Sequence, residues 1–139
     1  MPAMPEETLL AFDYGTRKIG VALGNTLTGQ ARPLRILTPV TREQRFSQVA
    51  ALLDEWRPDR VIVGLPLTLD GGEQPASRLA RRFANQLQGR FGVVVELVDE
   101  RGSSLEAQQL LGTHAADDAV AACVILQRYL DARIPAARV

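Results

Sequence analysis

The stretch 9–25, LLAFDYGTRKIGVALGN, decides the fold of this chain. It predicts two apolar strands, Leu9–Asp13 and Ile19–Leu23, joined by the polar turn Tyr14–Lys18. The first strand is apolar without interruption until its last residue, a pattern typical of a strand that is buried on both faces. We therefore expect this strand to lie in the middle of a sheet that is covered on both sides.

A carboxylate, Asp13, follows directly on this apolar run. A charge at the rim of a core is costly unless a cation compensates it. Arg17 and Lys18 in the turn could compensate it structurally, and a divalent metal could do so functionally. Because a lone aspartate at a strand end is also a common turn former, the choice depends on the rest of the chain.

Length and composition indicate one soluble globular domain, residues 1–139, with 46% hydrophobic and 23% charged residues. The N-terminal MPAMPEE lacks the apolar region of a signal peptide, and no run approaches the roughly 18 apolar residues of a membrane span. The single cysteine, Cys123, excludes an internal disulfide and suits a reducing compartment. We expect a cytoplasmic protein with no membrane segment.

The formal net charge is zero, which argues against a uniformly basic nucleic-acid coat but is compatible with a bipolar surface. Of the sixteen basic residues, all but Lys18 are arginine. Arginine binds phosphate in a bidentate manner and would suit a nucleic-acid partner, although genome-wide codon bias is the simpler explanation of the excess. Charge alone does not decide the partner.

The remaining elements follow in alternation. In chain order we predict a strand at 34–37, a helix from the capping box Thr41/Gln44 to Pro58, a strand at 60–64, a ten-residue loop at 65–74, a helix from Pro75 through Leu87, a strand at 93–98, a helix from Ser103 through Leu111 and a last helix from Asp117 to about Ala132. Three leading strands followed by alternating helices and strands predict an α/β fold with a mixed five-stranded sheet flanked by helices. This is the ribonuclease H-like arrangement, which the halves of actin-like ATPases share.

Three acidic clusters fall where parallel strands end or a helix begins: Asp13, Asp99–Glu100 and Asp117–Asp118. Functional sites of open α/β sheets gather at the carboxyl ends of the strands, so the three clusters could meet at one edge. Such a set would bind two Mg²⁺ or Mn²⁺ ions and support phosphodiester hydrolysis. The structural alternatives are a solvated turn at 99–100 and a helix cap at 117–118.

Periodicity favours one member of each acidic pair. From Asp118, the helical spacing leads to Ala122, Ile125 and Tyr129, an apolar line that should face the sheet. From Asp117, the same spacing ends in Arg128 and should face solvent.

Strand alternation gives Asp99 the face of Val95 and Leu97. Glu100 comes where the strand ends, and its longer side chain could reach back over the sheet edge. We therefore expect Glu100 and Asp118 to complete the site with Asp13.

Four segments, FDYGTRKIGVAL, VGLPLTLDG, VDERGSSLEAQ and DDAVAACVILQRYL, resemble in order and spacing those of the YqgF/RuvX family. The resemblance covers roughly residues 8–131. It implies a ribonuclease H-like nuclease, related to Holliday-junction resolvases, that matures the 5′ end of pre-16S rRNA. By this resemblance, the family's first-strand aspartate matches Asp13, the acidic pair of its DER motif matches Asp99 and Glu100, and its helix aspartate matches Asp118.

One departure from the family pattern is Gly102-Ser103-Ser104, which stands where Leu-Thr-Thr usually follows the DER motif. Ser103 and Ser104 keep the hydroxyl pair, and we expect them to bind substrate. Arg17, Lys18 and Arg101 are expected to flank the carboxylates and hold phosphates.

Four functions remain open from the sequence. The first is a metal-dependent endonuclease that acts on structured RNA, and the second cuts four-way DNA junctions, for which a C2 homodimer rather than a monomer would be favoured. A nucleotide-binding module is a third, since DYGT also resembles the phosphate loop of actin-like ATPases. The fourth is a non-catalytic nucleic-acid-binding scaffold. His114 could protonate a leaving group, although an exposed loop histidine is the simpler interpretation.

Overall fold

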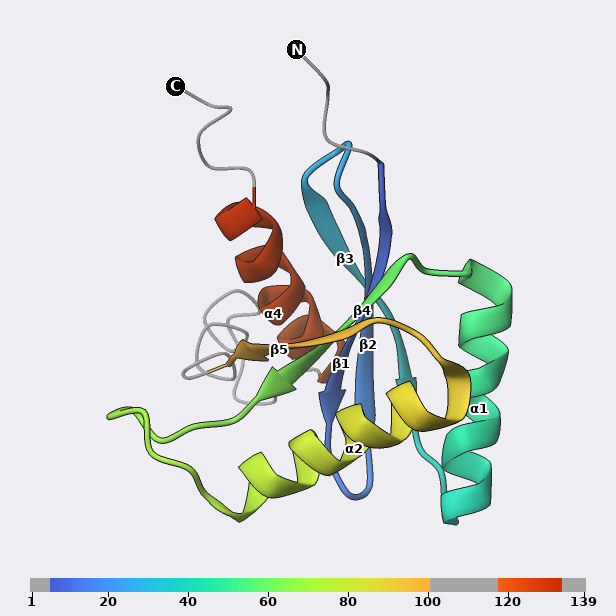
Figure 1. Ribbon diagram of the computed structural model, residues 1–139, viewed down its shortest axis with the longest axis vertical. Helices are drawn as coiled ribbons and strands as arrows, with labels where there is room; N and C mark the ends of the chain where they lie inside the picture. The colour runs from blue at the N-terminus through green and yellow to red at the C-terminus, as the bar shows by residue number, and fades with distance from the viewer. Residues whose placement is uncertain (1–5, 101–117, 134–139) are drawn as a thin grey trace.

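The structure, a computed structural model, describes residues 6–100 and 118–133. Over these residues the chain forms five strands and three helices (Figure 1). In chain order they are β1 (Thr8–Tyr14), β2 (Ile19–Asn25), β3 (Gln30–Leu37), α1 (Arg42–Trp56), β4 (Arg60–Leu65), α2 (Pro75–Phe91), β5 (Val95–Asp99) and α4 (Asp118–Arg133). The helix predicted for 103–111 lies outside the described residues.

The five strands form one mixed sheet in the order β3-β2-β1-β4-β5. β1 to β3 pair as an antiparallel meander, and β1, β4 and β5 pair in parallel. The predicted mixed sheet with a central first strand is therefore confirmed.

The strand predicted at 34–37 is longer than expected, because β3 already begins at Gln30 and takes in residues 30–33, which we would have placed in a loop. Pro33 is compatible with this strand because β3 lies at the sheet edge and its register shifts beside Val21 and Ala22.

Helices cover both faces of the sheet, with α1 and α2 on one side and α4 on the other (Figure 1). Side chains of β1 alternate between the two layers: Leu10 and Phe12 pack under α1 and α2, whereas Leu9 and Ala11 pack under α4. All four are fully buried. Because helices cover both faces of β1, all of its buried positions must be apolar, whereas a strand covered on one face needs apolar residues only at alternate positions.

The predicted start of α1 is confirmed at atomic detail. The Gln44 N–H donates to Thr41 Oγ1 at 3.1 Å, as a capping box requires. The Gln44 side chain accepts from the Val40 N–H at 2.8 Å instead of from Thr41. The apolar spacing of α1 predicts a buried stripe of Phe46, Val49, Ala50, Leu53 and Trp56. The buried side is shifted in part, since Leu52 is fully buried and Leu53 only half-buried.

The apolar residues of α2 predict a buried side made of Ala76, Leu79, Ala80, Phe83 and Leu87, which the structure confirms in part. Ala80, Phe83 and Leu87 are buried as expected, but Ala76 is exposed and Leu79 is 39% exposed. Ser77 takes their place and is fully buried. Its hydroxyl donates to the Pro66 carbonyl and accepts from the Gln74 N–H, so it fastens the β4–α2 loop to the start of the helix.

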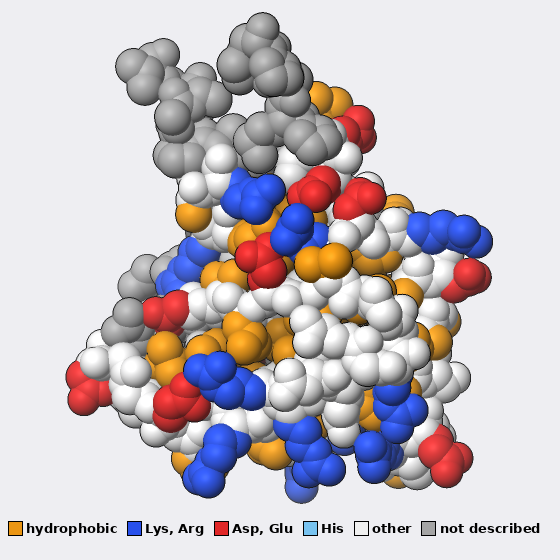
Figure 2. Space-filling model, viewed as in Figure 1, with side chains coloured by type: hydrophobic (Ala, Val, Ile, Leu, Met, Phe, Trp, Pro, Cys, Tyr) orange, Lys and Arg blue, Asp and Glu red, His pale blue; other side chains and the backbone are white. Residues whose placement is uncertain are grey.

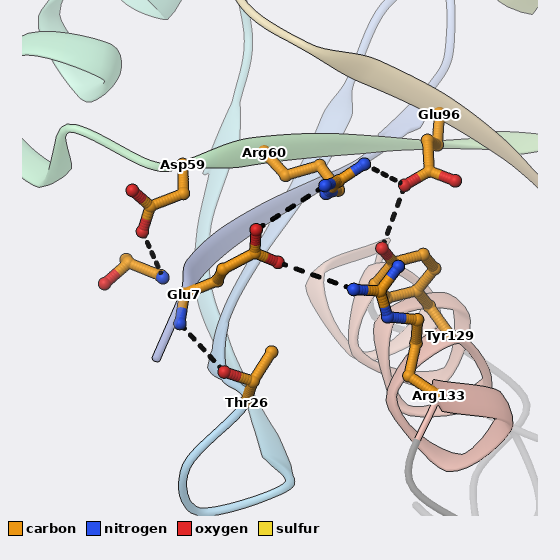
Figure 3. Close-up of polar contacts among 8 residues, drawn as sticks. Glu7, Thr26, Asp59, Arg60, Glu96, Tyr129 and Arg133 are labelled. Carbon is orange, nitrogen blue, oxygen red and sulfur yellow. Dashed lines mark hydrogen bonds and ion pairs between the residues drawn. The ribbon is translucent and has the colours of Figure 1, made fainter. Parts of the chain in front are cut away.

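A polar network joins the end of the molecule where β1 begins to the last turns of α4 (Figure 3). Arg60 contacts Glu96 at 2.7 Å and Glu7 at 3.5 Å, and Arg133 lies 3.9 Å from Glu7. The Tyr129 hydroxyl donates to Glu96 at 2.9 Å. Burial, together with this hydrogen bond to a carboxylate, raises the pKa of Tyr129 to about 12.

We expect Ser77→Ala to lower the free energy of unfolding by about 1–3 kcal/mol, because the half-buried Pro66 carbonyl loses its donor from the fully buried Ser77 hydroxyl. Urea denaturation would measure the loss. Ser47→Ala is the matched control, since Ser47 is an exposed serine of α1 and should change stability by less than about 0.5 kcal/mol. Equal effects of the two substitutions would contradict the role assigned to Ser77.

The raised pKa of Tyr129 predicts a loss of stability in alkali. The folded state holds the proton longer than the unfolded state does, so this contribution is complete below the ordinary pKa of 10 and is lost as the pH rises toward 12. Ultraviolet titration of the wild type and of Tyr129→Phe isolates this phenol in the difference curve. A difference curve with a midpoint near the ordinary value of 10 would show that the network does not hold the proton.

Candidate active site

The carboxyl end of β1 places Asp13 on the sheet face that α4 covers. Leu9 and Ala11 point to that face, and strand alternation gives Asp13 the same side. Phe12 is paired with Val63 of β4, so Asp13 and Gly64 are the next residues along two neighbouring strands. Asp13 is half-buried, at the boundary between core and solvent.

Glu100 lies on the same face, reached from β5. Its N–H donates to the Leu65 carbonyl at 3.1 Å, so strand pairing continues one residue beyond Asp99. Alternation then gives Glu100 the side of Glu96 and Val98, both of which contact α4 or its core cluster. The Glu100 side chain is buried, with 9% exposure.

Gly64 of β4 provides the space for this carboxyl group. A Cβ atom added at Gly64 would lie 3.0 Å from the Glu100 Cδ and 3.2 Å from its Oε1. The Glu100 carboxyl therefore lies directly over Gly64. Gly64 belongs to β4, which is the neighbour of β1, the strand that carries Asp13. From the sequence alone, Gly64 is only the uncharged end of the strand predicted at 60–64. A glycine that ends an otherwise β-branched strand was the available signal, because it marks a close approach.

Asp99 lies on the opposite side of the sheet. Val95 and Leu97, with which it alternates in phase, pack into the cluster under α1 and α2. Its backbone carbonyl accepts from Arg128 at 3.2 Å. The structure therefore separates the two neighbours, with Glu100 on the face of Asp13 and Asp99 on the other.

The last predicted carboxylate belongs to the start of α4. This helix begins at Asp118, whose side chain lies outside the described part of the structure. The line predicted to continue from Asp118 does face the sheet, since Ala122, Ile125 and Tyr129 all belong to the α4 core cluster.

The companion prediction, that the Asp117 line of α4 faces solvent, is wrong for its first members. Ala121 and Val124 are only 2% and 6% exposed. α4 is thus buried over more of its circumference than its periodicity indicated.

Two predicted phosphate-binding residues are described and three are not. Arg17 and Lys18 are exposed in the turn that follows Asp13, at the same edge of the sheet. Arg101, Ser103 and Ser104 lie outside the described residues, as do Asp117 and His114.

The residues present suit a hard divalent cation. Carboxylate oxygens are the ligands that Mg²⁺ and Mn²⁺ prefer, and the space left by Gly64 lets the Glu100 carboxyl lie beside the strand of Asp13. Among the described side chains, no group of three or more His, Cys, Asp or Glu is arranged to hold a metal ion. Asp13 and Glu100 are the two described members of the predicted donor set, and Asp118 is the third predicted member.

Comparison with known proteins identifies the chain. A family model described as RuvX, Holliday junction resolvase, matches residues 7–132. The chain belongs to the RuvX family. A relative from Bordetella parapertussis, named “Putative pre-16S rRNA nuclease”, is 76% identical over 128 residues, which cover 92% of this chain and 96% of that protein. A relative of the same name from Cupriavidus necator is 56% identical over 124 residues, covering 89% and 88% of the two chains.

Solved structures show the same fold. RuvC of T. thermophilus, in complex with a Holliday junction substrate, superposes with a TM-score of 0.57 at 18% identity, covering 91% of this chain and 95% of that chain. The fowlpox virus Holliday junction resolvase superposes with a TM-score of 0.56 at 12% identity, covering 90% and 99%. At such identities the likeness concerns the fold alone, and it confirms the predicted ribonuclease H-like fold of this RuvX chain.

The space at Gly64 can be tested directly. In the RuvX chain we expect Gly64→Ala to displace the Glu100 carboxyl and to weaken Mn²⁺ binding by about tenfold or more, as measured by isothermal titration calorimetry. Gly24→Ala is the matched control, because its Cβ would lie 2.8 Å from Leu126 Cδ2 on the same helix α4, as that of Gly64 would lie 2.6 Å from Ile125 Cδ1. Both should cost about 1–3 kcal/mol of stability through overpacking. Equal Mn²⁺ affinities in the two variants would contradict the role of Gly64.

Proposed function

We propose that this RuvX-family protein is a divalent-metal-dependent endonuclease that processes the 5′ end of pre-16S rRNA. The observation that carries the proposal is the placement of Asp13 and Glu100 on one face of the sheet, with Gly64 between their strands. The similarity to relatives named for this activity, at up to 76% identity, supports the substrate.

Asp13, Glu100 and Asp118 would hold the metal, and we propose two Mg²⁺ or Mn²⁺ ions. When bound, the ions supply an activated water and stabilise the leaving oxygen of the phosphodiester. The carboxylates would offset the ionic charge and fix the metal positions relative to the sheet. α4 and the buried Ile125 beside Gly64 would keep the Glu100 carboxyl in place and limit solvent access from the core side.

Substrate binding is proposed for the residues around this edge. Arg17 and Lys18 follow Asp13 directly, so a phosphate near the carboxylates would lie within reach of the turn. Arg101, Ser103 and Ser104 follow Glu100 in the sequence and are proposed to contact the same strand of nucleic acid. Each lost phosphate contact should reduce binding without altering the carboxylates.

A second candidate substrate is a four-way DNA junction, which the description of the matching family model favours. The two substrates can be compared side by side, with the purified protein, Mg²⁺, Mn²⁺ or chelator, a pre-rRNA 5′ leader and a synthetic junction. Symmetric cutting of the junction would require a homodimer, whereas leader cleavage is compatible with a monomer. Preferential cutting of the junction at equal concentrations would overturn the rRNA proposal.

We propose that the protein acts in the cytoplasm, because pre-rRNA, the proposed substrate, is processed there in bacteria. Within the described residues, none of the helices has the length and apolar character needed to cross a membrane.

Asp13→Asn should abolish cleavage while the protein stays folded. The amide is nearly isosteric but bridges metal ions poorly, and removing one of several neighbouring carboxylates relieves repulsion, so stability should stay level or rise. Cleavage assays in Mg²⁺ and a thermal denaturation curve measure the two effects. A folded variant that retains wild-type cleavage would refute the metal site.

The acidic neighbours provide an internal control for the other two ligands. Glu100→Gln and Asp118→Asn should abolish Mn²⁺-dependent cleavage, whereas Asp99→Asn and Asp117→Asn should retain most of it. The physical reason for the first pair is that Glu100 and Asp99 lie on opposite faces of the sheet. The reverse pattern, with activity lost only in the Asp99 and Asp117 variants, would show that the assignment is wrong.

A further inference from the structure

Charge is distributed unevenly over this electroneutral chain. At the end of the molecule where β1 begins, described arginines are paired with carboxylates: Arg60 with Glu7 and Glu96, and Arg133 with Glu7. Two further pairs, Arg57 with Asp54 and Arg35 with Glu55, lie near the C-terminal end of α1. Among the described residues at this end, most of the positive charge is therefore paired with carboxylates.

At the opposite end, basic side chains gather with few carboxylates. Figure 2 shows Lys and Arg side chains along the lower edge of the view, over α2 and beside α1. Six described basic residues lie in the β1–β2 turn, in the first turns of α1 and on α2, and we call them the basic ridge: Arg17, Lys18, Arg42, Arg45, Arg82 and Arg90. Within the described part of the chain none of the six forms an ion pair with a carboxylate.

Aromatic rings hold part of the ridge in place. The guanidinium of Arg90 lies 4.0 Å from the centre of the Phe46 ring, and that of Arg42 lies 5.9 Å from the same ring. Arg45 lies 5.4 Å from the Tyr14 ring. A guanidinium stacked on a ring keeps its N–H donors at the ring edge, so it is already ordered and can still bind a phosphate.

The surface between α1 and α2 is hollowed at this point. A cavity of about 530 Å³ is lined there by Arg42, Phe46, Arg90 and Phe91, together with Ser47 and Glu43. Glu43 is the acidic residue among these and lies at the first turn of α1. The hollow thus presents two arginines on its rim over an apolar floor.

The ridge and the carboxylates share one edge of the sheet. β3 runs in the same direction as β1, since both are antiparallel to β2, and α1 begins five residues after β3 ends. Tyr14, the residue after Asp13, stacks on Phe83 of α2 with ring centres 4.6 Å apart. The candidate site lies on the α4 face and the ridge on the α1/α2 face, with the Arg17–Lys18 turn between them.

We propose that the basic ridge binds the phosphate backbone of the nucleic acid that flanks the cleaved bond. The substrate crosses the sheet edge at the Arg17–Lys18 turn and continues along α2 toward Arg42 and Arg90. This inference rests on the proposed nuclease function and adds a binding surface on the face opposite the carboxylates. The ridge offers only positive charges, so it would bind the phosphate backbone without distinguishing one base sequence from another.

The test uses the triple variant Arg42→Gln/Arg82→Gln/Arg90→Gln and fluorescence anisotropy with a labelled RNA duplex across a salt series. Each lost phosphate contact removes about 0.9 from the slope of log affinity against log salt, so the slope should fall by about 2 to 3. In cleavage assays KM should rise and kcat should stay unchanged, because the carboxylates are untouched. The same three positions changed to Lys should restore most of the slope.

The matched control is Arg32→Gln/Arg35→Gln/Arg57→Gln, which removes the same charge from the other end of α1 and includes a ring-stacked arginine, Arg32 at 5.8 Å from Trp56. It should leave the slope unchanged. Equal slopes of log affinity against log salt in both triple variants would refute the binding role of the ridge. That outcome would not affect the proposed nuclease function, which cleavage by the wild type tests separately. A wild type that binds neither RNA nor DNA would instead refute the proposed function. Competition by polyglutamate as strong as by RNA would indicate an acidic protein partner and would also overturn the proposal.

Discussion

Burial of β1 on both faces is the constraint on which the rest of the structure depends. Its side chains alternate between two separate hydrophobic clusters, so neither helical layer can be removed without exposing part of the central strand. This double burial requires a run of apolar residues with no polar interruption, and Asp13 can appear only where the run leaves the core. The position of the candidate site is therefore a consequence of where the core ends.

Much of this arrangement could be predicted because it depends on local patterns. Uninterrupted apolar residues identify the central strands, the Thr41 cap identifies the start of α1, and the spacing of Ala122, Ile125 and Tyr129 identifies the sheet-facing side of α4. Each signal involves residues close together in the sequence, where propensity and periodicity act directly. The placement of Asp13 at a strand end follows from the same reasoning.

The features that escaped prediction depend on neighbours distant in the sequence. The early start of β3 results from pairing with β2, which overrides the turn character of Pro33 at a sheet edge. Leu79 is exposed because α2 presents Ser77 to the β4 loop instead. The space that Gly64 leaves for Glu100 involves residues 36 positions apart, on β4 and beyond β5, together with Ile125 of α4. A glycine in a strand indicates a close approach, but no local pattern identifies which residues make it.

The position of α4 in the chain has a consequence for the order of folding. Within the described residues, α4 alone covers the second face of a sheet whose strands all precede it. During synthesis, therefore, Leu9, Ala11 and Ile62 stay exposed until residues 118–133 have left the ribosome. The helix that begins with Asp118 also brings the last predicted metal ligand. A nascent chain would thus close the second half of its core and gain the last predicted carboxylate in the same step.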